Sequence, residues 1–169
     1  MLLHKPPGYE CSRKPRHQPS VLALLPAPLR VRGLQPVGRL DEDTTGLLLL
    51  TDDGALMHRL TSPKKRVPKV YEVRTKHALD EAQTARLLAG VVLDDSPEPV
   101  RAAACVRTGE RDLRMTITEG KYHQVKRMLA AVGNRVDGLH RSAFGALQLP
   151  PDLAPGSWSW IDDATALWG

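Results

Sequence analysis

The sequence predicts an α+β fold with a mixed, largely antiparallel sheet and flanking helices. Two observations favour this class: strands that alternate apolar and polar residues recur, and helical segments separate them in an irregular order. Alternating strands are half-exposed, as in antiparallel sheets, whereas parallel sheets are buried on both faces. The 169 residues suffice for one core, or for two small lobes that share a cleft, so we assign residues 1–169 to a single domain.

In the first part of the chain, residues 1–37 are predicted to be irregular, apart from a short helix over residues 21–25. The next element is a buried strand at Leu47 to Leu50, because four leucines bounded by Gly and Thr form an apolar run of strand length. Carboxylates at residues 52–53 then start a short helix, since they cap free N–H groups, and Pro63 ends it.

In the second part of the chain, residues 70–76 alternate and predict a half-exposed strand. A helix follows from Asp80 to Leu88, with Gly90 after it, and a further strand is predicted over residues 113–117. Residues 121–132 are the clearest helix, because their apolar residues recur at three- and four-residue spacing. Trp158 to Trp160 predict a short final strand.

Charge and cysteine usage limit the function classes. The formal net charge of +5 suits an anionic partner such as nucleic acid. Cys11 and Cys105 form no Cys-x-x-Cys pair and the histidines show no zinc spacing, so we expect reduced thiols and no metal site. No apolar run approaches the length of a membrane span. We expect a monomeric cytoplasmic protein.

Asp41 is the first candidate for chemistry, because it lies on a tight connection just before the predicted buried strand. A turn or cap residue is the plainer interpretation. Asp41, Asp43 and Thr45 also match the D-x-D-x-T pattern of haloacid-dehalogenase-type phosphatases, in which the first Asp attacks phosphorus beside Mg²⁺. In those enzymes the apolar strand precedes the motif, whereas here it follows, which weighs against that alternative.

Three further places could share a cleft with Asp41. The basic loop at residues 64–69 suits phosphate contacts, although most charged loops are only solvated. Tyr71 is either a core aromatic or a ring on which a base stacks. Lys126 lies at the edge of the apolar helix face, where it could pair with Asp41 or point into solvent.

These places, in this order, resemble the pseudouridine synthases of the RsuA/RluE type. The resemblance covers nearly the whole chain and is carried by residues 5–9, 38–54, 69–73, 119–128, 132–136 and 139–141. Within the family, residues 43–46, 122–128 and 152–156 are most similar to the members that act on 16S ribosomal RNA.

The resemblance implies an α+β catalytic domain with a central RNA-binding cleft that isomerises one uridine of ribosomal RNA to pseudouridine, without cofactor or metal. Asp41 would be the catalytic carboxylate, as nucleophile or as base. Tyr71 would stack on the target base and assist proton removal from carbon 5, and Lys126 would pair with Asp41. The substrate pocket would include Arg39, Leu40 and Val125. RNA contacts are expected from Lys5, Arg13, Lys64, Lys65, Arg66, Lys69, His123, Arg127 and Arg141.

Relatives of this type usually carry a small RNA-binding domain before the Lys-Pro motif, and here Met1 lies only four residues before Lys5, so we expect no such accessory domain. Two alternatives stay open: a synthase that acts on 23S ribosomal RNA, and a non-catalytic RNA-binding or ribosome-assembly module that uses the same basic loops.

Overall fold

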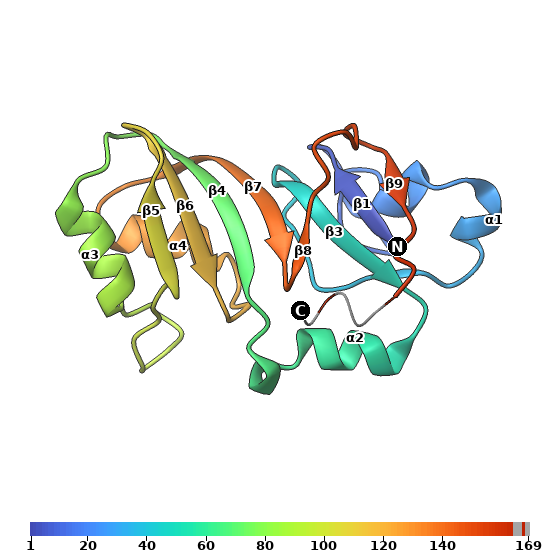
Figure 1. The fold of residues 1–169 in the computed structure, drawn as a ribbon, viewed down its shortest axis with the longest axis horizontal. Helices are drawn as coiled ribbons and strands as arrows, with labels where there is room; N and C mark the ends of the chain where they lie inside the picture. Colours follow the sequence, from blue (N-terminus) through green and yellow to red (C-terminus); the bar gives the residue numbers. More distant parts are fainter. Residues whose placement is uncertain (164–166, 168–169) are drawn as a thin grey trace.

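In the computed structural model, which describes residues 1–163 and 167, helices flank one large sheet (Figure 1). The elements in chain order are β1 (Leu2–Lys5), the 3₁₀ helix η1 (Val21–Leu24), α1 (Ala27–Arg30), β2 (Gln35–Pro36), β3 (Thr45–Thr51), α2 (Gly54–Thr61), the 3₁₀ helix η2 (Pro63–Lys65), β4 (Lys69–Thr75), α3 (Glu81–Ala89), β5 (Ala104–Arg107), β6 (Asp112–Ile117), α4 (Gln124–Ala131), β7 (Val136–Phe144), β8 (Leu147–Gln148) and β9 (Trp158–Ser159).

The strand order of the sheet is β5-β6-β4-β7-β3-β1-β9, with β2 added to β3 and β8 added to β7. Every pairing of these strands is antiparallel except that of β3 with β7, which is parallel. The prediction of a mixed, largely antiparallel sheet in an α+β fold is therefore confirmed.

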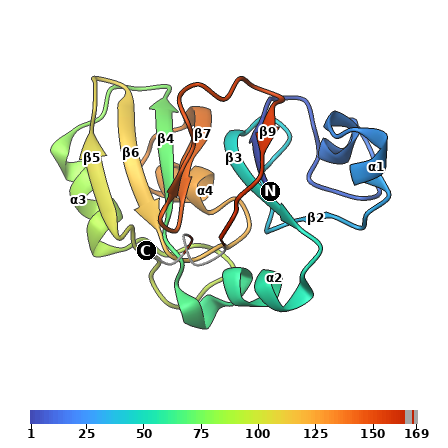
Figure 2. The ribbon, with the colours of Figure 1, turned by 45° about the vertical axis from the view of Figure 1, so that its right-hand side comes forward.

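The single parallel pairing joins two halves of the molecule. In Figures 1 and 2, β4 to β7 with α3 and α4 form one half, and β1, β3 and β9 with α1 and α2 form the other. The two halves meet where Thr45 and Gly46 of β3 pair with His140 and Arg141 of β7. The loop that carries Asp41 ends at this junction, so it lies between the two halves.

The β3 strand is buried on both faces, as its run of leucines predicts. Leu48 and Leu50 pack in one apolar cluster with residues of α4 such as Met128. Leu47 and Leu49 point the other way, into a second cluster that contains Phe144. The strand that follows the Asp41 loop is thus held from both sides, and the position of the loop is fixed.

The structure corrects several predicted elements. Residues 2–5 form a strand rather than an irregular segment, and β7 is a nine-residue strand that the sequence did not reveal. Small and charged side chains interrupt the alternation of β7, and its identity depends on pairing with β3 and β4. The clearest helix begins at Gln124, not at residue 121, because His123 adopts a left-handed backbone conformation with φ of 45°. No helix in the described part of the chain is long and apolar enough to cross a membrane.

The N-terminus of α3 offers a test of local stability. Asp80 caps it, with Oδ1 accepting from the backbone N–H of Gln83 at 2.7 Å. We expect Asp80→Ala to lower the free energy of unfolding by about 1 kcal/mol, because the N–H loses its acceptor. Urea denaturation followed by circular dichroism measures the change. Glu98→Ala, on an exposed loop, is the control, and an equal loss in both variants would contradict the capping role.

Candidate active site

The loop that carries Asp41 is held by buried hydrogen bonds before β3 begins. The N–H of Thr44 donates to the carbonyl of Asp41 at 3.0 Å, which closes a turn. The ammonium of Lys5 donates to the carbonyls of Glu42 and Thr44 at 3.1 and 2.8 Å, and it also reaches the carbonyl of Pro6. Leu40, buried just before Asp41, donates its N–H to the Sγ of Cys11.

These contacts correct the expected role of Lys5. Its side chain is fully buried, and its three donors are directed at backbone carbonyls. Burial lowers the pKa of Lys5, and the nearby Cys11 and acidic residues of the loop only partly oppose this effect. In this structure Lys5 fixes the Asp41 loop and cannot reach an RNA backbone.

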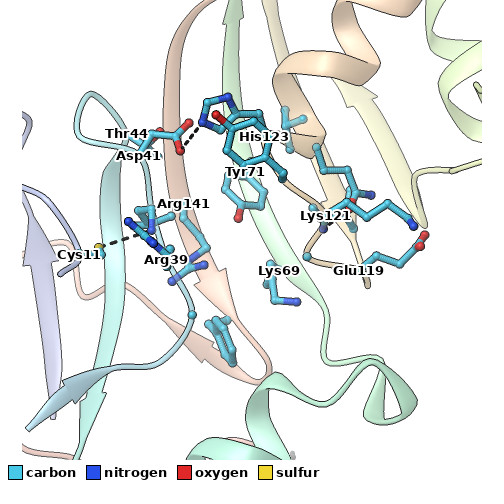
Figure 3. A pocket seen from close by; sticks show the side chains of 18 of the residues that line it. Cys11, Arg39, Asp41, Thr44, Lys69, Tyr71, Glu119, Lys121, His123 and Arg141 are labelled. Atoms are coloured by element: carbon cyan, nitrogen blue, oxygen red, sulfur yellow. Dashed lines mark hydrogen bonds and ion pairs between the residues drawn. The ribbon is translucent and has the colours of Figure 1, made fainter. Parts of the chain in front are cut away.

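The carboxylate of Asp41 contacts two nitrogen groups. One is the ammonium of Lys126 on α4, and the other is the imidazole of His123, the residue just before α4. Oδ2 of the carboxylate is 2.9 Å from Nζ of Lys126. Its Oδ1 is 3.0 Å from Nε2 of His123 (Figure 3), and this contact is an ion pair only while the imidazole is protonated. The expected pairing of Asp41 with Lys126 is therefore present. The side chain of Asp41 is 28% exposed, so it lies at the wall of an open cleft rather than in a closed core.

Lys126 forms ion pairs with two carboxylates, because its Nζ is also 3.0 Å from Oδ1 of Asp43. Burial works against the ammonium, but hydrogen bonds to Asp41 and Asp43 outweigh it and raise the pKa of Lys126. For Asp43, desolvation opposes ionisation, while the hydrogen bond and charge of Lys126 hold its pKa below the usual range. The sequence pattern did not indicate that Asp43 shares Lys126.

The cleft beside Asp41 has a volume of about 960 Å³. Tyr71, on β4, is almost fully buried and lines it together with Leu40 and Val125. Arg39 also lines the cleft, from the exposed side of the loop. The loop before β3, the strand β4 and the helix α4 thus bring Asp41, Tyr71 and Lys126 to one cavity, although they are far apart in the sequence.

The predicted RNA-contacting cations fall into two groups. Lys69, His123 and Arg141 line the cleft. Apart from the buried Lys5, the remaining cations lie outside the cleft. Four of them are exposed, Arg13, Lys64, Lys65 and Arg66, and Arg66 donates to Thr118 at 3.0 Å. The guanidinium of Arg127 pairs with Asp95 and donates to the carbonyl of Tyr122. Arg127 is already engaged within the protein, so it is less available to an RNA phosphate than the sequence suggested.

Among residues 1–163 and 167, no group of three or more His, Cys, Asp or Glu side chains is arranged to hold a metal ion. Asp41 is instead paired with nitrogen groups. A carboxylate held between nitrogen groups in an open cleft is placed to act on an organic substrate.

The shared ammonium predicts a pH-dependent stability. The lowered pKa of Asp43 gives stability above about pH 4 that is lost as the pH falls through the lower folded-state value. The raised pKa of Lys126 gives stability below about pH 10 that is lost as the pH rises through the higher folded-state value. We expect Lys126→Met to lower the free energy of unfolding by about 1 kcal/mol between pH 5 and pH 9, and by less outside this range.

Urea denaturation at a series of pH values from 2 to 11 checks the expectation. Lys76→Met, at an exposed position just after β4, is the control and should show no such window. A loss that stays constant from pH 7 to pH 2 would mean that the methionine acts through packing rather than through charge.

Comparison with known proteins identifies the class that this fold and cleft define. Residues 1–131 match the family described as RNA pseudouridylate synthase, and the chain belongs to this family. It is 45% identical over 157 residues to "Ribosomal small subunit pseudouridine synthase A" of Yersinia pestis, which covers 93% of this chain and 66% of that protein. The protein of the same name from Vibrio parahaemolyticus is 39% identical, with coverage of 99% and 73%. The chain thus spans about two thirds of the length of such relatives.

Solved structures agree with this assignment. A crystal structure of a pseudouridylate synthase superposes with a TM-score of 0.87 at 42% identity, covering 92% of this chain and 66% of the other. A chain of an archaeal box H/ACA sRNP complex superposes with a TM-score of 0.60 at 18% identity, covering 91% of this chain and 50% of the other, which shows a shared fold alone.

Proposed function

We propose that this chain isomerises a uridine of ribosomal RNA, in the small-subunit 16S RNA, to pseudouridine, with Asp41 as the catalytic carboxylate. The observation that carries the proposal is the meeting of Asp41, Tyr71 and Lys126 at one cleft. Membership of the RNA pseudouridylate synthase family supports the reaction. The relatives that are 39% and 45% identical are named for the ribosomal small subunit, which supports 16S RNA as the substrate.

The reaction moves a bond without adding or removing atoms. The bond between N1 of uracil and carbon 1 of the ribose breaks, the uracil turns, and its carbon 5 bonds to carbon 1 of the ribose. Carbon 5 then loses its proton, and N1 gains one. In this proposal Asp41 acts on the ribose, either by attacking carbon 1 or by removing a proton from the sugar.

The neighbours of Asp41 suit this chemistry. Lys126 keeps its ammonium 2.9 Å from Oδ2 of Asp41, so the carboxylate is held in one position at the wall of the cleft. Tyr71 offers a planar ring in the cleft on which the detached uracil can stack while it turns, and its phenol can assist removal of the proton from carbon 5. The apolar side chains of Leu40 and Val125 would exclude water from the reacting atoms.

The target nucleotide must leave its helix to reach this cleft, and unstacking a base costs a few kcal/mol. Contacts to the RNA backbone would supply compensating energy, and the exposure of Lys64, Lys65 and Arg66 in the basic loop supports this role for them. We further propose that the protein works as a monomer in the cytoplasm. Light scattering coupled to gel filtration tests the first part of this statement.

The direct test is to incubate the chain with 16S and 23S RNA transcripts and with 30S particles, and to map pseudouridine by carbodiimide labelling and primer extension. We expect one new pseudouridine in 16S RNA, in one or both forms of the substrate. A new site only in 23S RNA would overturn the choice of subunit. Salt-dependent RNA binding that leaves every uridine unchanged would support a non-catalytic RNA-binding module instead.

Metal removal separates this proposal from the phosphatase alternative. We expect pseudouridine formation to be unchanged in EDTA at an ionic strength at which the RNA stays folded without Mg²⁺, because the ammonium of Lys126 already supplies a cation to the Asp41 carboxylate. Release of inorganic phosphate from p-nitrophenyl phosphate, measured with and without Mg²⁺, is the parallel assay. Mg²⁺-dependent phosphate release by the wild-type chain that Asp41→Asn abolishes would contradict the proposal.

A further inference from the structure

Lys69 and Arg141 bring two positive charges to the lining of the cleft, and neither forms an ion pair within the described part of the chain. Both line the cavity that contains Asp41 and Tyr71, and Figure 3 shows them on the neighbouring strands β4 and β7. Nζ of Lys69 lies 5.7 Å from the centre of the Phe144 ring, and the guanidinium carbon of Arg141 lies 5.0 Å from the same centre. The two cations therefore share one aromatic ring.

Arg141 is the buried member of this pair. Its side chain is only 2% exposed, and its Nε donates to the carbonyl of Leu47 at 2.9 Å, which ties β7 to β3. Within the described part of the chain its Nη2 has no hydrogen-bond partner. Among residues 1–163 and 167, no carboxylate lies within ion-pair distance of this guanidinium. A buried guanidinium without a carboxylate is costly, so an anion bound in the cleft would stabilise it.

Lys69 is the accessible member. Among residues 1–163 and 167, its ammonium has no carboxylate within ion-pair distance. It stands beside the loop before α4, since a Cβ built on Gly120 would lie 3.9 Å from its Nζ. Burial and the charge of Arg141 lower the pKa of Lys69, and Glu119 opposes this only in part. An anion that enters the cleft would relieve both effects.

We propose that Lys69 and Arg141 form a phosphate-binding subsite, which holds one phosphate group of the RNA strand next to the extruded uridine. This inference rests on the proposed function for the identity of the ligand, because an RNA nucleotide cannot enter the cleft without its phosphate. Lys69 makes the direct contact as a mobile ammonium, and Arg141 supplies a fixed charge behind it. The subsite lies beside Tyr71, whose backbone pairs with that of Arg141, so it positions the nucleotide for stacking.

A binding experiment tests the subsite without relying on catalysis. The isotope-labelled chain is titrated with inorganic phosphate at constant ionic strength, and backbone amide shifts are followed by NMR; acetate is the reference anion. Uridine 5′-monophosphate and uridine are compared in the same way. We expect saturable shifts at β4 and β7 with phosphate and the monophosphate, and at least fivefold weaker binding of acetate and uridine.

Lys69→Met keeps the aliphatic stem and should weaken phosphate binding at least fivefold, whereas Lys69→Arg should restore it. Lys76→Met, just beyond the same strand, is the matched control and should bind as the wild type does. Lys69→Met should also reduce the salt dependence of RNA binding by about one counterion. Unchanged phosphate affinity in Lys69→Met, or equal binding of acetate, would overturn the subsite.

The two proposals fail separately. If no uridine is converted but phosphate binding still depends on Lys69, the subsite stands and the proposed reaction is wrong. If pseudouridine forms at the wild-type rate and affinity in Lys69→Met, and phosphate does not shift β4 or β7, the reaction stands and the subsite is wrong.

Discussion

Asp41→Asn should abolish pseudouridine formation, with a fall in rate of at least about 10³-fold. An amide keeps the shape of the side chain but can neither attack the ribose nor accept a proton from it. The fold should survive, because the loop is held by the backbone bonds of Thr44 and by Lys5, none of which involves the carboxylate. Single-turnover assays on 16S RNA measure the rate, and filter binding shows that RNA affinity is retained.

Asp43→Asn is the matched control, because it removes a second carboxylate from the same ammonium of Lys126 while leaving Asp41 in place. The side chain of Asp43 is 70% exposed, and we expect at most a tenfold fall in rate. A normal rate in Asp41→Asn, or equal losses in the two variants, would show that the assignment of Asp41 is wrong.

Gly46→Ala should be among the most destabilising single substitutions in the chain. Gly46 has φ of 112°, a conformation that costs an L-residue about 1–2 kcal/mol. It also lies between β1 and β7, where an added Cβ would come within 2.7 Å of the backbone N of Arg141. Because both neighbours are strands of the sheet, the backbone must shift, and we expect a total loss of about 3–5 kcal/mol.

Gly33→Ala separates the two causes. Gly33 also has positive φ, of 87°, but a Cβ there would meet nothing within 4 Å. It should therefore lose only the conformational part, about 1–2 kcal/mol. Urea denaturation followed by circular dichroism gives both values, and insolubility of Gly46→Ala beside soluble Gly33→Ala would agree with the ranking. Equal losses would mean that the close approach of β3 and β7 is not needed for stability.

Periodicity in the sequence was sufficient for the strongest elements. The leucine run predicts β3, alternation predicts β4 and β6, and the caps at Asp53 and Asp80 mark the starts of α2 and α3. These elements depend on local spacing and on side chains that bond to their own backbone, so the chain alone specifies them. The strand β7 lacks a clear pattern, because it carries a buried Arg and is defined by two neighbours that are far away in the sequence.

For the site, the sequence by itself determined which groups are present: the carboxylate of Asp41 on a turn before a buried strand, the ring of Tyr71, the cation of Lys126, and an order of motifs typical of one enzyme family. The pairing of Asp41 with Lys126 was expected, but the tertiary structure alone decided the other contacts of the site. It added Asp43 and His123 to the contacts of the central carboxylate and its cation, removed Lys5 from the RNA-contacting set, and brought Lys69 beside Arg141. The physical reason is that burial and charge pairing depend on distances across the β3–β7 junction, which spacing along the chain does not contain.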